Sequence, residues 1–565
     1  MLGIVAFGMR YLWWTAGRLR RRLVRPPEYV VFLVEGPLPD LPPPRRGFLE
    51  RHLAPAPPLS IWELSRRFEA VAGDPRVKGV VLHLRPLGLS PAKLDSLRGL
   101  IRNLRSTGKR VVAWASHYNR AAYYVACAAD EVLLQPGGSV GPLGLRQGYV
   151  FVAEALERLG VKGEFIRVSP YKTASDIFTH KEMSAEAREM ADWLADAHYR
   201  EHVQAIREGR RLDEDAARRL IDDSPFEDRA ALEAGAVDAL VHAEELPAHL
   251  GFRTGRGKQR PSRLAGWEAA RRRVLLPPPP RPGRFVALLR IEGTIVDGWS
   301  YSPPLRPPVP FLFDERVGDL SVVQQARRAL ADRRAASVLV YVNSPGGSAT
   351  ASEAIAAALE RLAAAKPVVV WMGEVAASGG YYVATPARWI VAQPGTITGS
   401  IGVLAGKFVQ LGLLQRLGIR QQWVERGESA GFFGWDRPFT PHEQEKVRAA
   451  VDRAYQLFLE RVARARRIPT EAAQGVGGGR VWTGSQALER SLVDELGGLD
   501  EALRKARALA GLHPKAAVRE IPAVRRFVAP PDPARAMELL RLVGSARPLC
   551  LMPILPAPCF LEPQG

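Results

Sequence analysis

The chain repeats itself once over most of its length, and this repeat limits the possible folds more than any other feature. "KGVVLHLR" at residues 78–85 resembles "ASVLVYVN" at residues 336–343. "AAYYVACAADEVLLQPGGSVGPLG" at residues 121–144 resembles "GGYYVATPARWIVAQPGTITGSIG" at residues 379–402. Both pairs lie 258 residues apart. A repeat that holds its register over this span predicts two copies of one domain rather than one large core.

The composition marks where the two copies begin and end. The chain has 565 residues, 47% of them hydrophobic, which is enough to bury two cores. A stretch rich in Gly, Arg and Pro between the copies is typical of a linker, and the Pro-rich end of the chain is expected to be poorly ordered. We expect an N-terminal anchor at residues 1–27, the first repeat at residues 28–250 and a linker at residues 251–283. The second repeat is expected at residues 284–512 and the tail at residues 513–565.

Short β-branched runs alternate with helical patterns inside each repeat. In the second repeat the order is "FVALLRI", "LSVVQQARRALAD", "SVLVYVN", "ASEAIAAALERLAAA" and "PVVVWM". Strand, helix and strand at these lengths predict right-handed crossovers between parallel strands. The expected fold class is therefore α/β, a tandem duplication with mainly parallel sheets and crossover helices.

The N-terminus reads "MLGIVAFGMRYLWWTAGRLRRRLVRPP". Its apolar run contains Arg10 and is shorter than the roughly 20 residues that span a bilayer, but Trp13 and Trp14 beside several arginines suit a membrane interface. We expect a membrane anchor, either interfacial or marginally spanning. The alternative is an arginine-rich signal region or a surface helix. Positive charge on the C-terminal side of the run would hold the body of the protein on the cytoplasmic side.

Charge and cysteine content exclude some classes of partner. The formal net charge of +20 comes from arginine spread along the whole chain, not from a basic stripe with aromatic residues between, so we expect no nucleic-acid binding. Cys127, Cys550 and Cys559 are odd in number and widely spaced. They predict neither a disulfide framework nor a metal site, and we expect no cofactor.

Two turns in the second repeat follow neighbouring predicted strands and carry the candidate chemistry. One contains Gly346 and Gly347 in "NSPGGS", and the other contains Ser378 and Gly379 in "AASGG". Ser378 is expected at the start of a helix, where the N–H of Gly379 and one from Gly346 or Gly347 would form a two-donor oxyanion hole. Either turn alone is typical of ordinary capping, but together they favour a nucleophilic serine. The first repeat has Arg120 at the position of Ser378.

A nucleophilic serine needs a base, and the second repeat offers no suitable histidine, since His442 and His513 lie in polar, solvated contexts. Lysine can act as the base when burial lowers its pKa, whereas arginine cannot. Only 12 of the 79 basic residues are lysine. Lys407 is one candidate, although the pattern around it favours an exposed charge on an amphipathic helix. Lys172, in the first repeat, is the other.

Four motifs resemble a known family. "VNSPGGSATASEA", "GEVAASGGYYVA", "PGTITGSIGV" and "SPYKTASDIFTHKEMSAEARE" are similar to the signal peptide peptidases of the long, duplicated bacterial type, and the likeness covers about residues 28–512. The resemblance implies the fold of the Clp protease subunit and the crotonases. It also implies Ser378 as nucleophile and Lys172 as general base, with Ser400 holding the lysine and Gly346 and Gly379 supplying the oxyanion-hole amides.

The resemblance further implies a homo-oligomer, a tetramer, anchored in the bacterial inner membrane with its body in the periplasm, degrading cleaved signal peptides and other extended apolar peptides. The arginines after the anchor argue for the opposite side of the membrane. Two other functions stay open: a crotonase-like acyl-CoA enzyme and a non-catalytic membrane scaffold. Whether Lys172 meets Ser378 within one chain or between chains also stays open.

Overall fold

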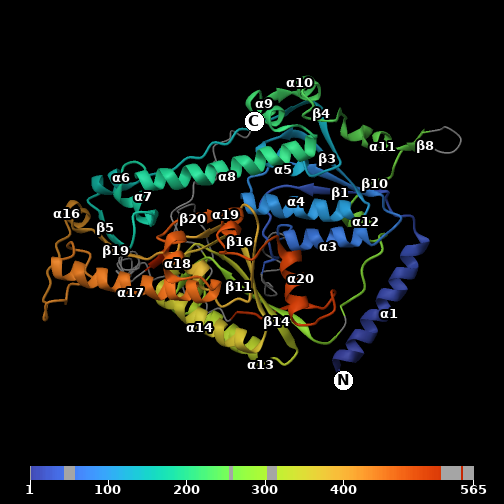
Figure 1. Cartoon of the computed structure of the whole chain (residues 1–565). Helices are drawn as coiled ribbons and strands as arrows, with labels where there is room; N and C mark the ends of the chain where they lie inside the picture. Colours follow the sequence, from blue (N-terminus) through green and yellow to red (C-terminus); the bar gives the residue numbers. More distant parts are fainter. Residues whose placement is uncertain are drawn as a thin grey trace. The chain divides into compact units, whose positions relative to one another are not determined.

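The computed structural model describes residues 2–43, 57–253, 259–280, 282–301, 315–523 and 549–551 (Figure 1). The chain forms two compact units. The first unit comprises residues 1–146 and 196–282, and the second comprises residues 147–195 and 283–565. Residues 147–195, which lie in the first repeat of the sequence, belong to the second unit.

The first unit is built on a mainly parallel sheet. All neighbouring strands are parallel except the last pair on the main path, which is antiparallel. In spatial order the strands are β10 (Leu264–Gly266), β1 (Tyr29–Val34), β2 (Gly79–Leu84), β3 (Arg110–Tyr118), β4 (Glu131–Val140) and β6 (Phe226–Glu227), with β7 (Ala239–Leu240) also paired to β4. A separate short hairpin joins β8 (Phe252–Arg253) and β9 (Gln259–Arg260).

Helices connect these strands in the order expected for crossovers. The helices of the first unit are α1 (Leu2–Leu23), α3 (Ile61–Ala72), α4 (Pro91–Ser106), α5 (Arg120–Ala126), α9 (Glu214–Asp222), α10 (Asp228–Glu233), α11 (Leu246–His249) and α12 (Trp267–Ala270). α3 begins at a capping box in which Ser60 and Glu63 each bond the other's backbone N–H. α8 (Ala185–Arg210) begins in the second unit and ends in the first.

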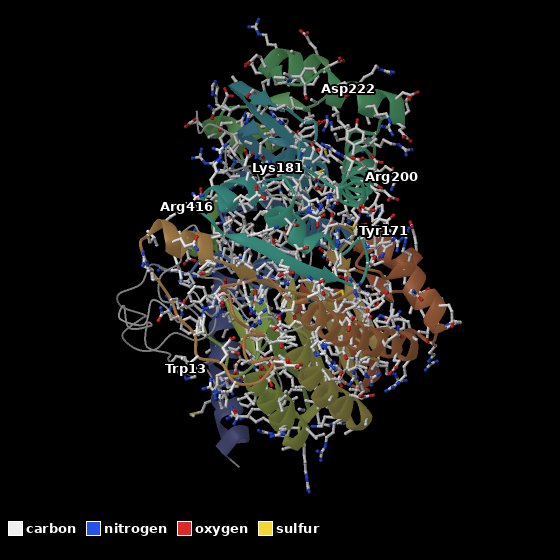
Figure 2. The ribbon with its side chains drawn as sticks, turned by 90° about the vertical axis from the view of Figure 1, so that its left-hand side faces the viewer. Trp13, Tyr171, Lys181, Arg200, Asp222 and Arg416 are labelled. Atoms are coloured by element: carbon white, nitrogen blue, oxygen red, sulfur yellow. The ribbon has the colours of Figure 1, made fainter. Side chains whose placement is uncertain are left out.

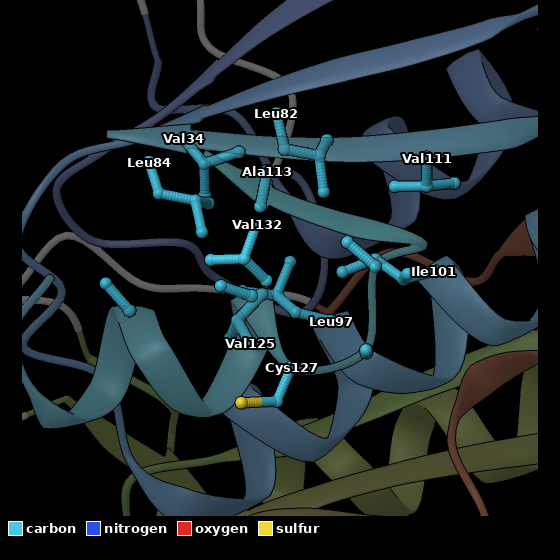
Figure 3. Packing of buried hydrophobic residues seen from close by; sticks show 14 of the residues in the cluster. Val34, Leu82, Leu84, Leu97, Ile101, Val111, Ala113, Val125, Cys127 and Val132 are labelled. Carbon is cyan, nitrogen blue, oxygen red and sulfur yellow. The ribbon is translucent and has the colours of Figure 1, made fainter. Parts of the chain in front are cut away.

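The central strands of the first unit are buried on both faces. Leu82, Ala113 and Val132 belong to one hydrophobic cluster, together with Leu97 and Ile101 of α4 (Figure 3). The intervening residues of the same strands form a second cluster that includes Val81, Val112 and Leu133. Successive side chains of a strand point to opposite faces, so a sheet covered on both sides needs the unbroken apolar runs seen in the sequence.

The second unit repeats this arrangement around its main sheet. Apart from three short strands of another sheet, the order β11, α13 (Asp319–Ala331), β14, α14 (Ala349–Ala365), β16, α15 (Gly379–Tyr382), β17 corresponds to β1, α3, β2, α4, β3, α5, β4 of the first unit. The sheet order is β20 (Val481–Thr483), β18 (Ile397–Gly399), β16 (Val368–Ala377), β14 (Ala335–Ser344), β11 (Phe285–Glu292) and β22 (Val518–Glu520), with β17 (Trp389–Ala392) paired to β16 and to β21 (Glu495–Leu496). The predicted α/β class with mainly parallel strands is confirmed.

A second sheet in this unit explains why residues 147–195 belong to it. The sheet order is β13 (Arg316–Gly318), β12 (Thr294–Val296), β15 (Gly346–Ser348), β23 (Leu549–Leu551), β19 (Leu404–Val409) and β5 (Lys162–Arg167). β5 pairs with β19 antiparallel along its whole length, from Lys162 opposite Val409 to Arg167 opposite Leu404. Main-chain hydrogen bonds therefore tie a segment of the first repeat into the second unit.

The remaining helices of the second unit lie between or after these strands. They are α6 (Ala153–Arg158), the 3-10 turn Thr173–Ser175, α7 (Asp176–Thr179), α13 (Asp319–Ala331), α14 (Ala349–Ala365), α15 (Gly379–Tyr382), α16 (Leu411–Arg416), α17 (Pro441–Arg466), α18 (Thr470–Val476), α19 (Gly484–Glu489) and α20 (Leu499–Leu509). α17 begins at a capping box between Thr440 and Glu443 with a proline in its first turn, the arrangement typical of a firm helix start.

Two segments assigned from composition contain regular structure. Within residues 251–283, expected as a linker, β10 extends the first sheet and Leu264 pairs with Tyr29. Within residues 513–565, assigned as the Pro-rich tail, β22 pairs with β11, and β23, in the part expected to be poorly ordered, pairs with β15. In each case pairing with distant strands supplies the order that local composition does not indicate. The rest of the tail after residue 523 lies outside the described residues.

The N-terminal segment is a helix, α1, with large apolar side chains exposed. The exposed fraction is 69% at Leu12 and 80% at Trp13, which is labelled in Figure 2. Arg20, Arg21 and Arg22 occupy its last turn, where positive charge favours the helix dipole. Among the helices of the described residues, none combines the length and the apolar character needed to cross a membrane.

Candidate active site

Ser378 lies in the turn between β16 and α15, in a backbone conformation rare for any residue but glycine. Its φ is 54° and its ψ is −115°. The turn is held because the Ser378 N–H donates to the carbonyl of Gly399, at 2.8 Å. A side chain on Gly380 would come within 2.5 Å of the carbonyl oxygen of Ser344, so only glycine lets this turn approach the end of β14 so closely.

Lys172 reaches Ser378 within the same unit. The distance from Lys172 Nζ to Ser378 Oγ is 2.7 Å. Nζ also lies 2.9 Å from both the carbonyl oxygen and the Oγ of Ser400. Lys172, Ser378 and Ser400 are each 0% exposed. The structure thus places the three residues singled out from sequence in one buried cluster, and it does so within a single chain.

The backbone of Ser400 is shaped to present both of its oxygens to the lysine. Its φ is 51°, which is uncommon for a residue with a side chain. The Ser400 N–H donates to the carbonyl of Arg480 at 2.6 Å, and this bond fixes the loop after β18. The three oxygens that these contacts place around the Lys172 amine belong to two hydroxyl groups and one backbone carbonyl.

The segment that carries Lys172 is held to the second unit by aromatic packing as well as by β5. Tyr171, labelled in Figure 2, stacks with Trp193, and the ring of Trp193 lies 5.0 Å from that of Trp482 on β20. The guanidinium of Arg480 lies 3.9 Å from the centre of the Tyr171 ring. The Trp193 indole also donates to the carbonyl of Val481, at 2.9 Å. These contacts hold the segment that carries Lys172 against β20.

The two glycine turns expected to form an oxyanion hole lie side by side. A Cβ atom on Gly379 would be 3.1 Å from Gly346 Cα and 3.2 Å from Gly347 N. In this structure the N–H of Gly346 donates to Ser344 Oγ at 3.1 Å. The Gly346 N–H can therefore bind an oxyanion only after it leaves Ser344 Oγ. Ser344 was not singled out in the sequence analysis.

Helix α15 is anchored directly after Ser378. The hydroxyl of Tyr381 donates to the carbonyl of Leu492 at 2.8 Å. The hydroxyl of Tyr382 makes a short hydrogen bond to Glu353, and Arg461 Nε binds the same carboxylate at 2.6 Å. Burial, with Glu353 beside it, raises the pKa of Tyr382 above its usual range, so the phenol stays neutral. The helix that positions Ser378 is thus pinned at two successive side chains.

Lys407, the other lysine considered as a base, is not the exposed helical residue that its pattern favoured. It lies on strand β19 and is 0% exposed. Its Nζ is 3.4 Å from the carbonyl oxygen of Phe432 and 4.2 Å from the centre of the Phe439 ring. Burial lowers its pKa. The helical interpretation was wrong because pairing with β5, far away in sequence, makes this segment a strand.

Two further groups close around the site. The carbonyl of Gly402 lies 3.4 Å from Ser378 Oγ. Gly479 packs against the backbone of Lys172, and its N–H donates to the carbonyl of Ile401 at 2.8 Å. The "GGG" run at residues 477–479 was the one available signal for this contact. Within the described part of the chain, no group of three or more His, Cys, Asp or Glu side chains is placed to hold a metal ion.

Adding a methyl group at Gly479 should displace Lys172. A Cβ there would lie 2.6 to 2.8 Å from the backbone N, Cα and Cβ of Lys172, and the φ of 88° disfavours any side chain. Gly479→Ala should lower the rate of peptide hydrolysis by about 10²-fold, the effect of a displacement near 1 Å. Gly475→Ala is the matched control, because nothing lies within 4 Å of its Cβ position. Equal activity of the two variants in a fluorogenic peptide assay would contradict this packing.

Comparison with known proteins places the chain in a family. The model of peptidase family S49 matches residues 103–251 and again residues 360–513. The serine protease SPPA of the Arabidopsis thaliana chloroplast is 30% identical over 80% of this chain, which spans 66% of that protein's length. Protease 4 of Haemophilus influenzae is 31% identical over 82% of this chain and 75% of its own length. Protease 4 of Salmonella typhi is 31% identical over 80% of this chain and 72% of its own length.

The fold and these matches define the class of the protein as a peptidase with a duplicated domain. The chain belongs to peptidase family S49. The two separate matches to one family model confirm the tandem duplication. Among solved structures, a mutant of ClpP1 from Listeria monocytogenes covers 38% of this chain and 93% of its own at 14% identity, with a TM-score of 0.23, a likeness too low to bear on the fold.

Proposed function

We propose that this chain is a serine endopeptidase in which Ser378 is the nucleophile and Lys172 the general base, acting on cleaved signal peptides and other extended apolar peptides at a membrane. The observation that carries this proposal is the 2.7 Å distance between Lys172 Nζ and Ser378 Oγ inside a fully buried cluster. A general base must lie within hydrogen-bond reach of the proton it takes.

In this mechanism the neutral amine of Lys172 takes the proton of Ser378 as Oγ attacks the peptide carbonyl carbon. The oxyanion that forms is bound by the N–H groups of Gly379 and Gly346, once the Gly346 N–H has left Ser344 Oγ. The Lys172 ammonium then gives its proton to the leaving amine, and water hydrolyses the acyl-enzyme. Ser400 is a positioning residue, because its two oxygens accept from Nζ and fix its direction.

The choice of substrate rests on the resemblance of the four motifs, and the proposed contact with a membrane rests on α1. The exposed apolar side chains of that helix, above all Trp13, and the three arginines of its last turn suit an anionic lipid surface. By resemblance the protein is a homo-oligomer at the bacterial inner membrane with its body in the periplasm. The charge rule for the arginines after the anchor favours the cytoplasmic side.

The experiment that tests this function is labelling of the purified full chain with a fluorophosphonate, followed by mass spectrometry of the modified peptide. We expect one adduct, at Ser378, together with hydrolysis of an apolar fluorogenic peptide. An acyl-CoA enzyme or a non-catalytic scaffold would give neither result. Repeating the assay with anionic vesicles tests the membrane assignment, because the chain should sediment with them.

A further inference from the structure

We propose that Arg480 is a positioning residue for the general base, because it holds the segment that carries Lys172 and the loop that carries Ser400 at the same time. This inference rests on the proposed function, since it concerns the lysine of that same site. Arg480 directly precedes β20 and is half-buried. Its effect on the Lys172 amine is exerted through Tyr171 and Ser400, the residues that it contacts.

The backbone of Arg480 fixes the loop that surrounds the lysine amine. Its carbonyl accepts the N–H of Ser400 at 2.6 Å. Ser400 in turn supplies two of the three oxygens that lie within 2.9 Å of Lys172 Nζ. The N–H of Arg480 donates to the carbonyl of Gly477 at 3.2 Å, which closes the turn at residues 477–480. The direction of the amine therefore depends on where this turn lies.

The side chain of Arg480 joins the same turn to the lysine segment. Its guanidinium lies 3.9 Å from the centre of the Tyr171 ring, and its Nη1 donates to the carbonyl of Gly477 at 3.3 Å. A planar cation is attracted to the face of an aromatic ring and can stack on it. Because Tyr171 directly precedes Lys172 in the chain, this one side chain links the turn to the base.

Arg480 is one end of a stack of side chains whose other end offers a matched comparison. In order, the stack contains Arg480, Tyr171, Trp193, Trp482 and Arg490. The guanidinium of Arg490 lies 3.9 Å from the centre of the Trp482 ring, which belongs to β20 and not to the lysine segment. Each of the two indole N–H groups donates to a backbone carbonyl at 2.9 Å. The tryptophan rings therefore have contacts that hold them without either arginine.

Arg480→Met tests this role in the full chain. Methionine keeps much of the apolar stem but lacks the guanidinium, so Lys172 should be less well aligned with Ser378. We expect kcat for the fluorogenic peptide to fall by roughly 10- to 10²-fold with KM unchanged, since a displacement near 1 Å costs about 10²-fold. Arg490→Met is the matched control and should keep the wild-type kcat. Equal kcat values in the two variants, or a rise in KM alone in Arg480→Met, would overturn the proposal.

The rate of fluorophosphonate labelling separates alignment of the lysine from folding of the chain. The reagent reacts with Ser378 without a peptide in the site, so labelling of Arg480→Met should be slower by about the same factor as kcat. The final amount of label per chain should equal that of the wild type, because the protein stays folded. Labelling at the wild-type rate, or a smaller final amount of label at an unchanged rate, would contradict the proposal.

A second pair of variants keeps the test decisive if Arg480→Met does not fold. Tyr171→Phe retains the ring over which the guanidinium lies, whereas Tyr171→Leu removes it. We expect kcat to be roughly tenfold lower in Tyr171→Leu than in Tyr171→Phe. Equal values would overturn the proposal. Failure of the proposed function is a different result: no labelling of Ser378 in the wild type, or full activity in Lys172→Met, whatever the Arg480 and Tyr171 variants do.

Discussion

Replacing Ser378 by alanine should abolish peptide hydrolysis, with kcat falling by roughly 10⁶-fold, as for other serine peptidases that lose their nucleophile. The reason is that alanine lacks the Oγ atom that attacks the peptide carbonyl. In the wild type this atom lies 2.7 Å from Lys172 Nζ. The fluorophosphonate adduct should disappear at the same time. Hydrolysis of the fluorogenic peptide by purified chain, with unchanged circular dichroism, is the measurement.

The backbone at this position gives the same experiment a stability readout. With φ of 54° and ψ of −115°, Ser378 lies where only glycine is unstrained, and such a conformation costs on the order of 1–3 kcal/mol. Ser378→Ala keeps the Cβ atom and the strain, whereas Ser378→Gly removes both. After allowing for the greater freedom of glycine in the unfolded chain, Ser378→Gly should be more stable than Ser378→Ala by about 1 kcal/mol.

Both variants should be inactive, so the two measurements separate strain from chemistry. The free energy of unfolding is compared between the glycine and alanine chains by urea titration. A glycine variant less stable than the alanine variant would show that the surroundings do not force this conformation. Peptide hydrolysis at the wild-type rate in either variant would show that Ser378 is not the nucleophile.

Much of the fold follows from local pattern, because the strands of the main sheets are buried on both faces. Runs such as the one from Val368 to Trp371 are apolar without a break, and the structure makes them central strands. The turns that end β14 and β16 were recognisable for the same reason: a glycine pair begins two residues after each of these strands. Repetition of the pattern 258 residues earlier supported the assignment of both copies.

The segments that sequence analysis misassigned are those whose structure depends on a distant partner. Lys407 is on a strand because β19 pairs with β5, which comes from the other repeat. β10 and β23 are three residues each, and pairing with Tyr29 in one case and Gly346 in the other defines them. Composition describes such segments as linker or tail, since strand pairing is a non-local interaction that no window of sequence contains.

In the candidate site, too, the local features were predictable from sequence and the long-range contacts were not. Ser378, Gly346 and Gly379 follow from strand-to-helix turns within one repeat. The meeting of Lys172 with Ser378 could not be derived from local pattern, because 206 positions separate them and β5 is what carries the lysine across. Ser344 and Gly402 went unnoticed, since one contributes a hydroxyl at a strand end and the other only a backbone carbonyl.

Replacing Lys172 by methionine should lower kcat by roughly 10²- to 10⁴-fold, the usual contribution of a general base. Methionine is similar in length and apolar, so the packing around the buried site is preserved while the amine is lost. Lys407→Met is the matched control: Lys407 is also 0% exposed and its pKa is lowered by burial, but its amine contacts Phe432 and Phe439 instead of the serine.

The pH profile distinguishes a base from a structural lysine. The proposed step needs the neutral amine, so kcat/KM of the wild type should rise with pH as the Lys172 ammonium loses its proton, and then level off. That rising limb should vanish in Lys172→Met and persist in Lys407→Met. Full activity in Lys172→Met together with loss of activity in Lys407→Met would transfer the role of base to Lys407, and the short contact between Lys172 and Ser378 would then be structural only.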